Sequence, residues 1–520
     1  MKPPAPEAMQ PEGNGGRTAL AGAPVSFRHG VASGDPLADR VVLWTRVTVA
    51  DAPNMRVVYK VAHDPFMSAI VSYGEVVVGA ATDFVAKIDV VGLAPATTYY
   101  YQFEAAGARS PVGRTRTLPV GAVECLRIGV VSCSSFTRGY FNAYRHLARR
   151  NDLDCVLHLG DYIYEYAGDE LSDVRAHEPA AEIHTLEDYR TRHAQYKTDA
   201  DLQELHRQHP MISMWDDHET ADGARRDGAD NHDAATQGPW RVRVANALRA
   251  YHEWMPTRLA DPARPEKYYR DFKFGDLARL IMLEERLGHR DIPNNAAASS
   301  AQLLGIEQER WLAAQLHKRD VQWRIIGQGV MMSQLRLVSV ANGAGGSRYL
   351  NSDQWDGYAP ARDRFFNMLA GVGHHGRAEN VVVLSGDVHS SWASDLTPDP
   401  GNRDVSRGGY DPATGAGSLA VEFTTTSVTS LGLPGLPGIT ELALSINPQF
   451  KYANVVDRGY LLLDIDANRV GAEWWYVDDV RHPAANERFG AAFQVRSGTN
   501  RVEPGSVSLS RFDATPLAPG

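Results

Sequence analysis

Alternating apolar and polar positions dominate the first part of the chain. Between residues 25 and 119, short runs in which every second residue is apolar recur with turn residues between them. Such runs predict antiparallel strands that bury one face. They favour a small immunoglobulin- or fibronectin-like β-sandwich, although another antiparallel barrel fits the same alternation. The expected strands cover residues 40–47, 55–61, 74–78, 84–90, 93–101 and 113–119.

The pattern changes at about residue 126. Apolar runs typical of buried strands alternate with segments of helical periodicity, which predicts an α/β layered domain. The predicted strands cover residues 126–131, 155–159, 211–215, 278–283, 323–328 and 380–384. The predicted helices cover residues 142–150, 186–207, 240–251 and 308–318. Two later β-rich runs, 419–427 and 460–475, are expected to supply a second sheet, and residues 431–439 a Gly/Pro-rich loop.

Composition narrows the class of protein. At ~150 residues per domain, 520 residues suggest two to four domains. Apolar residues make up 43% and charged residues 22%, which argues against global disorder or a disulfide scaffold. No window approaches about 18 apolar residues, so we expect no transmembrane segment. The net charge of −10 argues against a general polyanion-binding surface, and we expect no nucleic acid as a structural partner.

The cysteines and the first residues bear on the compartment. Cys125, Cys133 and Cys155 are too few for a disulfide framework, and at most one pair is expected. Residues 1–24 are rich in Pro, Gly and Ala, and we expect them to be disordered. They lack the apolar stretch of a secretory signal. Either a signal was removed or the protein stays inside the cell.

Polar residues stand at the ends of four predicted strands. Cys133 follows the first of these strands, and Asp161 follows the second directly after Gly160. Open α/β sheets bind ligands beyond the carboxyl ends of their strands, so both side chains are candidates for a site. A buried inert thiol and a simple turn are the alternatives. His158, inside the apolar run, is expected to be a hydrogen-bonded core histidine.

The third strand end carries four consecutive ionisable residues, Asp216, Asp217, His218 and Glu219. Crowded carboxylates repel one another unless a cation compensates them. A metal site would do so, with Asp217 as a ligand and His218 as an acid. An exposed charged turn is the alternative.

The fourth strand end repeats the Gly-Asp arrangement and adds a histidine. Asp387 and His389 are two residues apart, and in an extended segment they lie on the same side. Both side chains can therefore face one ion. Oxygen and imidazole ligands suit a first-row metal, and carboxylates suit harder ions such as calcium.

These motifs, in this order, resemble the PhoD-type alkaline phosphatases, a branch of the calcineurin-like metallophosphoesterases. The matching stretches are residues 27–36, 43–46, 160–166, 215–219, 354–358 and 386–389. The resemblance covers roughly residues 25 to 480. It implies an α/β fold in which a four-layer α/β-sandwich metallophosphoesterase domain follows an all-β sandwich. The expected division is a β-sandwich at 25–119, a catalytic domain at 120–495 and a C-terminal tail at 496–520.

The resemblance also implies the cofactors, Fe(III) and calcium. The implied iron ligands are Cys133, Asp161, Tyr164 and His389. Asp161 matches a bridging carboxylate, and Asp217 and Asp387 match ligands on the calcium side. A thiolate and a phenolate are strong anionic donors that favour Fe(III), and neither suits an ordinary calcium site.

The implied mechanism follows from charge. Metal ions neutralise phosphate oxygens and activate a bound water or another metal-held oxygen as the nucleophile. His218 is the candidate acid for the leaving alkoxide, with Asp216 or Glu219 as its partner. The alternative is that His218 only hydrogen-bonds the metal shell.

Guanidinium groups are expected to contact the phosphate oxygens. The candidates are Arg286 and Arg290, beyond the predicted strand at 278–283, and Arg362. Two positions depart from the family pattern. Glu285 stands where many relatives have an aspartate, and residues 220–223 replace an asparagine-rich continuation.

The resemblance implies an enzyme that releases phosphate from phosphomonoesters and also cleaves some diesters. The substrate would be a small-molecule or polymer phosphate ester, and the oligomeric state is left open. A secreted or periplasmic location follows by analogy, although the twin-arginine signal is missing and a cytoplasmic one stays open. The alternatives are a phosphodiesterase or phospholipase D-like enzyme on lipid or wall-polymer diesters, and a non-catalytic surface-binding protein with structural metals.

Overall fold

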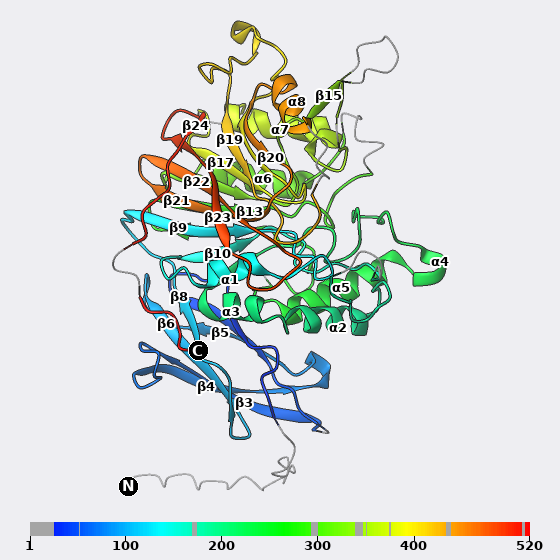
Figure 1. The fold of residues 1–520 in the computed structure, drawn as a ribbon, viewed down its shortest axis with the longest axis vertical. Helices are drawn as coiled ribbons and strands as arrows, with labels where there is room; N and C mark the ends of the chain where they lie inside the picture. Colours follow the sequence, from blue (N-terminus) through cyan, green and yellow to red (C-terminus); the bar gives the residue numbers. More distant parts are fainter. Residues whose placement is uncertain are drawn as a thin grey trace, which may run out of the picture.

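The computed structural model gives the fold of most of the chain (Figure 1). It describes residues 25–50, 52–168, 174–259, 261–292, 300–338, 347–349, 351–373, 376–432, 438–511 and 515–520. The segment 1–24, which we expected to be disordered, and the middle of the predicted loop at 431–439 lie outside these residues.

The largest sheet has ten strands, with four parallel strands near its middle. These are β9 (Cys125–Val131), β10 (Cys155–His158), β11 (Met211–Ser213) and β1 (Val31–Gly34). On one side, β9 pairs antiparallel with the first of four C-terminal strands. Those strands are β21 (Arg458–Asp466), β22 (Arg469–Val477), β23 (Glu487–Arg496) and β24 (Val502–Pro504).

A second sheet has seven strands in the order β12-β13-β14-β17-β19-β18-β20. Its parallel strands are β13 (Ala278–Met282), β14 (Trp323–Gly327), β17 (Val381–Ser385) and β19 (Ala420–Thr424). Its antiparallel strands are β12 (Arg270–Phe274), β18 (Ser391–Leu396) and β20 (Phe450–Asn454). A separate hairpin joins β15 (Arg336–Val338) and β16 (Ser347–Tyr349).

The expected membership of the second sheet was wrong. The run at 460–475 forms β21 and β22, which extend the first sheet by pairing with β9. The second sheet instead begins with β13 and β14 and takes only the run at 419–427, as β19. Apolar periodicity identifies a strand, but it does not say which neighbour the strand will pair with.

The two sheets share one hydrophobic core. The indole Nε1 of Trp474 on β22 donates to the carbonyl of Thr424 on β19 at 3.0 Å. On β17, Val382 and Leu384 belong to this shared core, whereas Val381 and Val383 pack in a second core. Because successive side chains of a strand point to opposite faces, both faces of the second sheet are covered. The second core includes residues of α6 (Gly305–Leu316) and α7 (Ala359–Ala370).

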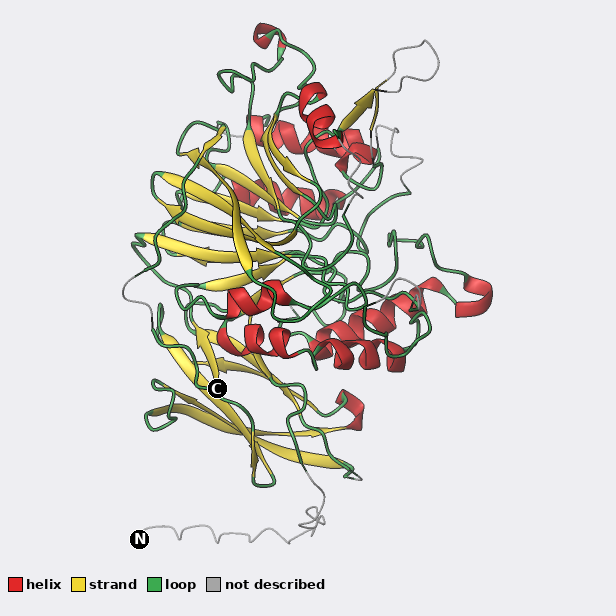
Figure 2. Ribbon diagram, viewed as in Figure 1, coloured by secondary structure: helices red, strands yellow, loops and turns green. Residues whose placement is uncertain are grey.

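The remaining helices lie mostly between the N-terminal strands and the large sheet (Figures 1 and 2). They are α1 (Asn142–Ala148), α2 (Leu186–Tyr196), α3 (Ala200–Gln208), α4 (Ala234–Gln237), α5 (Trp240–Trp254) and α8 (Ile439–Ile446). Short 3-10 helices are η1 (Ala80–Thr82), η3 (Trp355–Tyr358) and η4 (Val405–Arg407). None of the helices in the described part of the chain is long and apolar enough to cross a membrane.

The single helix expected at 186–207 is in fact two helices. The Asp199 carboxylate accepts hydrogen bonds from the backbone N–H groups of Asp201 and Leu202, both at 3.0 Å, and so caps α3. An N-cap residue has extended backbone, which ends the preceding helix.

The N-terminal strands form two sheets around a core of their own. One sheet holds β3 (Asn54–Ala62), β4 (Ile70–Gly79), β6 (Thr98–Ala105), β7 (Ala108–Arg109) and β8 (Gly113–Arg116). The other holds β1 (Val31–Gly34), β2 (Arg40–Arg46) and β5 (Val85–Val91), and it continues the ten-stranded sheet because β1 pairs with β11. The N-terminal strands are therefore joined by backbone pairing to the rest of the fold.

The C-terminal residues at 496–520, expected to be a tail, include β24 and contact both parts of the molecule. The backbone N–H of Ala518 donates to Gln208 at 2.8 Å, and Tyr100 donates to the carbonyl of Pro516 at 2.6 Å. Figure 1 places the C-terminus beside the N-terminal strands.

Candidate active site

Four residues that follow strand ends have left-handed backbone. The φ angles are 59° at Cys133, 56° at Asp161, 58° at Asp387 and 52° at His389. Such angles are uncommon for residues other than glycine and gather at functional sites. Before Asp161, the φ of Gly160 is 104°, and an added Cβ would lie 2.6 Å from the backbone nitrogen of Asp216. The turn after this strand therefore requires glycine at position 160.

The structure brings Cys133, Asp161 and His389 together. Their donor atoms lie within 4.8 Å of one another. The Tyr164 hydroxyl donates to Asp161 Oδ2 at 3.0 Å and lies 3.2 Å from His389 Nε2. It also accepts a hydrogen bond from Ser430 at 2.7 Å. The four side chains implied as iron ligands therefore adjoin one another.

Burial raises the pKa of the Cys133 thiol and of the Tyr164 phenol well above their ordinary values, and the nearby Asp161 carboxylate raises both further. Protein groups alone therefore keep these side chains neutral. A bound cation would lower both pKa values, because it stabilises the thiolate and the phenolate.

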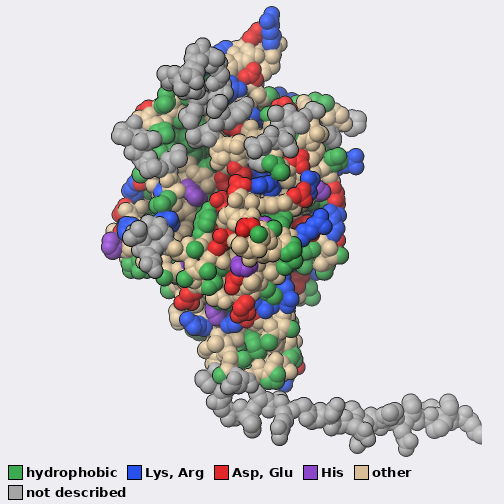
Figure 3. All heavy atoms as spheres, turned by 90° about the vertical axis from the view of Figure 1, so that its right-hand side faces the viewer, with side chains coloured by type: hydrophobic (Ala, Val, Ile, Leu, Met, Phe, Trp, Pro, Cys, Tyr) green, Lys and Arg blue, Asp and Glu red, His purple; other side chains and the backbone are tan. Residues whose placement is uncertain are grey.

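A second group consists of four carboxylates, with ligand oxygens within 4.8 Å of one another: Asp161, Asp216, Asp217 and Asp387. Burial raises the pKa of Asp161 and Asp216 well above the ordinary range, and adjacent carboxylates raise it further. Asp161 Oδ1 and Asp217 Oδ1 are buried and have no hydrogen-bond partner among the described residues. Figure 3 shows acidic side chains gathered on one face of the molecule, with basic side chains beside them.

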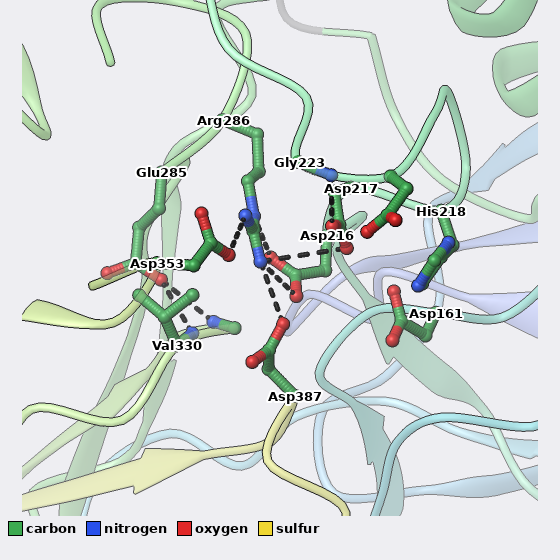
Figure 4. A network of polar contacts seen from close by, with 12 residues as sticks. Asp161, Asp216, Asp217, His218, Gly223, Glu285, Arg286, Val330, Asp353 and Asp387 are labelled. Carbon is green, nitrogen blue, oxygen red and sulfur yellow. Dashed lines mark hydrogen bonds and ion pairs between the residues drawn. The ribbon is translucent and has the colours of Figure 1, made fainter. Parts of the chain in front are cut away.

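Arg286 lies inside this carboxylate group (Figure 4). Its guanidinium binds Asp216 through two hydrogen bonds, of 2.5 and 2.9 Å. It also donates to Asp387 at 2.8 Å and to Asp353 at 2.6 Å, and it lies 3.6 Å from Asp217. One guanidinium cannot balance this many carboxylates if all of them are ionised.

Arg290 and Arg362, the other candidates for phosphate contact, are placed differently. Arg290 pairs with Asp353 and donates to the Tyr358 hydroxyl at 3.1 Å. Arg362 pairs with Asp356, and both side chains are buried. The structure thus brings Arg286, but not these two, into contact with the carboxylate group.

The partner expected for His218 was wrong. Its Nδ1 lies 2.7 Å from Glu165 Oε2, and not beside Asp216 or Glu219. The ring stacks on Tyr164 with centroids 4.3 Å apart. Burial lowers the pKa of His218, but Asp217, Glu165 and Asp161 outweigh burial, so the pKa lies well above the ordinary value.

Glu219, one of the two expected partners, holds backbone instead. Its carboxylate accepts hydrogen bonds from the N–H groups of Asp161, Tyr162 and Asp216 at 3.1, 2.7 and 2.8 Å. It therefore fixes the loops after β10 and β11 relative to each other. Asp216, the other expected partner, is occupied by Arg286.

Sequence reasoning missed several residues of the site. Glu165 is fully buried and also accepts hydrogen bonds from the Asp222 backbone and the Asn231 amide, both at 2.6 Å. Asp353 and Gln354 contact Arg286 and Asp387 from the segment before η3. Glu165 and Gln354 lay within stretches that matched the family, and this was the available signal.

Other sequence interpretations concern structural residues. His158 is buried, with Nε2 2.9 Å from the Tyr144 hydroxyl, which confirms a hydrogen-bonded core histidine. All three cysteines are free, so the pair allowed by the sequence does not form. Glu285 accepts the backbone N–H groups of Gly329 and Val330 at 2.9 and 3.2 Å and thereby holds a loop beside Arg286.

The donors present fit the metals that the resemblance implies. Asp161 adjoins a thiol, a phenol and an imidazole, and it also belongs to the group of four carboxylates. The unpartnered oxygens of Asp161 and Asp217 are the kind of buried polar atom that needs a ligand. Asp161 belongs to every ligand group found among the described residues, as a bridging carboxylate would.

Comparisons with known proteins agree with the resemblance. The family model described as PhoD-like phosphatase matches residues 128–474, and that of the PhoD-like phosphatase N-terminal domain matches residues 15–119. The chain is 34% identical to alkaline phosphatase D of Bacillus subtilis (strain 168) over 493 residues, which are 90% of this chain and 80% of the relative.

A solved structure titled "Structure of PhoD" matches with a TM-score of 0.82 and 33% identity over 94% of this chain and 93% of the other. This match confirms the α/β fold class. The chain therefore belongs to the PhoD-like phosphatase family and is a phosphoester hydrolase.

Proposed function

We propose that the protein is a metal-dependent alkaline phosphatase that hydrolyses phosphomonoesters, and some diesters, at an Fe(III)/calcium centre. One observation carries the proposal. Four carboxylates lie with oxygens within 4.8 Å of one another, and two of their buried oxygens have no hydrogen-bond partner among the described residues. Such a group needs cations beyond Arg286 to be stable when ionised.

The proposed ligands divide into two sides that share Asp161. Fe(III) would be held by Cys133, Tyr164 and His389 together with Asp161, because anionic sulfur and phenolate donors favour it. Calcium would be held by Asp217 and Asp387, since it prefers carboxylate oxygens. When bound, these cations neutralise the phosphoryl oxygens and lower the pKa of a water.

His218 is proposed to protonate the oxygen of the leaving alcohol. Glu165 holds Nδ1 of the ring, which leaves Nε2 to carry the donated proton. The neighbouring carboxylates keep His218 protonated, as a donor requires. Glu165 is thus a positioning residue that orients the donor and stabilises its charge.

Arg286 remains the candidate for contact with the phosphoryl group, because it is the predicted arginine that adjoins the carboxylates. Arg290 and Arg362 are proposed to hold Asp353 and Asp356 in place. Their effect on the substrate would be indirect.

The proposal extends to the domain arrangement and to location. The core shared by the two sheets and the helices on the outer face support a four-layer α/β sandwich over residues 120–495. The separate core of the N-terminal strands supports an immunoglobulin- or fibronectin-like sandwich at 25–119. By analogy with the family, we propose that the enzyme acts outside the cytoplasm. Fractionation of cells that produce the protein tests this.

Two assays test the proposed function. The enzyme should hydrolyse p-nitrophenyl phosphate faster than bis-p-nitrophenyl phosphate, and the reverse order would favour a diesterase. The purified protein should also show a visible charge-transfer band from Tyr164 on Fe(III). A protein that binds calcium alone and hydrolyses neither ester would be a surface-binding protein instead.

A further inference from the structure

A cavity of about 260 Å³ adjoins the carboxylate group. Its apolar lining comes from Met331, Leu335, Val388 and Trp392. Its polar lining includes Gln354 and Asp356.

Gln354 forms the wall between this cavity and the carboxylate group. Its side-chain Nε2 donates to Asp387, and its side-chain Oε1 accepts the backbone N–H of Met331 at 2.6 Å. Val388, which also lines the cavity, stands between Asp387 and His389 in the chain. The cavity therefore begins one side chain away from the proposed metal ligands.

Most polar groups of the lining are already paired, and the Asn351 side-chain oxygen accepts the backbone N–H of Asp353 at 2.8 Å. Asp356 is neutralised by Arg362 and accepts the backbone N–H of Leu335 at 2.9 Å. Ser390 accepts the Trp392 indole N–H at 2.8 Å and donates to the carbonyl of Val388 at 2.9 Å. The described lining contains no Lys, Arg or His. A phosphate group would find no cation there, whereas an uncharged apolar group would lose little on entering.

We propose that this cavity binds the alcohol part of the substrate, as a compact apolar aryl or short alkyl group. The proposal rests on the proposed function, since it places the phosphoryl group of the same ester at the carboxylates. In the reaction, the bond from phosphorus to the alcohol oxygen breaks and a water oxygen bonds to phosphorus, keeping one proton and releasing the other to solvent. The alcohol oxygen takes a proton from His218, which solvent then reprotonates.

The size of the cavity limits the occupant. An apolar cavity of about 150 Å³ binds benzene. A volume of about 260 Å³ accommodates a substituted ring or a short alkyl chain, but it is too small for the acyl chains of a phospholipid. A Met sulfur and a Trp ring in the lining favour an aromatic group further.

The test is Val388→Phe, in which a larger side chain fills the cavity. Val388 lines the cavity and is half-buried. The matched control is Val372→Phe, at a valine that is 64% exposed. The substrates are phenyl phosphate, butyl phosphate and glycerol phosphate. Relative to the wild type, Val388→Phe should lower kcat/KM about tenfold for phenyl phosphate, and less than twofold for glycerol phosphate. The control should change neither value.

The butyl ester distinguishes the two kinds of apolar occupant. A loss for both phenyl and butyl phosphate supports an apolar site of broad range, and a loss for phenyl phosphate alone supports an aryl site. Equal losses for all three esters, or no loss for any, would overturn the proposal.

A binding measurement separates this proposal from the proposed function. Phenylphosphonate and methylphosphonate carry the same charged group, so calorimetry on the metal-loaded wild type compares the apolar part alone. Phenylphosphonate should bind about tenfold more tightly, and equal affinities would contradict the cavity assignment. If the wild type hydrolysed none of the esters, the proposed function would fail while this comparison still tested the cavity.

Discussion

Two buried clusters of ionisable side chains lie close together in this protein, and they differ in charge. The carboxylate group holds four acids around one arginine. The other, which we call the histidine cluster, links His158, Tyr162, Lys197 and His206, together with His193. Its Lys197 Nζ lies 3.1 Å from His206 Nε2, and the Tyr162 hydroxyl lies 2.8 Å from the same atom.

Burial acts on the two clusters in different ways. It lowers the pKa of Lys197 and His206 well below their ordinary values, which disfavours the charged form of both side chains. The carboxylate group keeps Arg286 charged beside several acids, and two of its oxygens have no hydrogen-bond partner among the described residues. Burial of titratable groups is therefore not in itself the mark of an active site. What distinguishes the carboxylate group is that its acids outnumber the arginine beside them.

The strongest loss of activity is expected when the carboxylate that both proposed metal sites share is removed. Asp161→Ala should lower kcat by about 10³-fold or more and reduce the metal content, because both proposed metal sides share this carboxylate. Elemental analysis and turnover of p-nitrophenyl phosphate measure the two effects. Asp363→Ala, at an exposed helix position, is the control. Normal activity in Asp161→Ala would remove this residue from the site.

The next effect concerns the proton donor. His218→Ala should lower kcat by about 10²-fold while the metals stay bound, since the side chain is proposed to protonate the leaving group and not to bind metal. The exposed His482→Ala should leave kcat unchanged. Unaltered kinetics in His218→Ala would make His218 a bystander.

A smaller loss of kcat is expected when Glu165, which contacts His218 and not the substrate, is changed. Glu165→Gln should lower kcat about tenfold, because the carboxylate orients and charges His218 without touching the substrate. In the background of His218→Ala, the same change should cost little more, as expected for two residues that act as a unit. Independent, additive losses would show that Glu165 acts in some other way.

The smallest effect is on stability, and it belongs to the histidine cluster. His193 is fully buried, and neither ring nitrogen has a hydrogen-bond partner among the described residues. His193→Phe should therefore stabilise the fold by about 1 kcal/mol at pH 7 without changing kcat. Equilibrium denaturation measures the gain, and an unchanged or lower stability would contradict this view of the cluster.

The pH dependence of that gain has a definite sign. Burial, followed by Lys197 and Arg192, lowers the pKa of His193 from 6.5 to about 3 in the folded state. Below pH 6.5 His193 becomes protonated in the unfolded chain but stays neutral in the folded chain. The free energy of unfolding of the wild type therefore falls. The advantage of His193→Phe should grow by about 1.4 kcal/mol per pH unit down to about pH 3. A stability gain that did not change with pH would mean that His193 takes up a proton as readily in the folded chain as in the unfolded chain.

The sequence predicted the strand ends well and their partners poorly. Asp161, Asp387 and Cys133 stand directly after apolar strands, and parallel strands place such residues at one edge of a sheet. The Glu165–His218 pair depends on the path of two loops, about which periodicity carries no information. The division of the strands into two sheets was missed for the same reason, since pairing is a property of tertiary structure.

Metal dependence is best tested by measuring metal content and turnover in one sample, before and after chelation. Hydrolysis of p-nitrophenyl phosphate should disappear as iron and calcium leave and return when both are restored, while circular dichroism stays the same. A folded, metal-free protein with full activity would contradict this dependence.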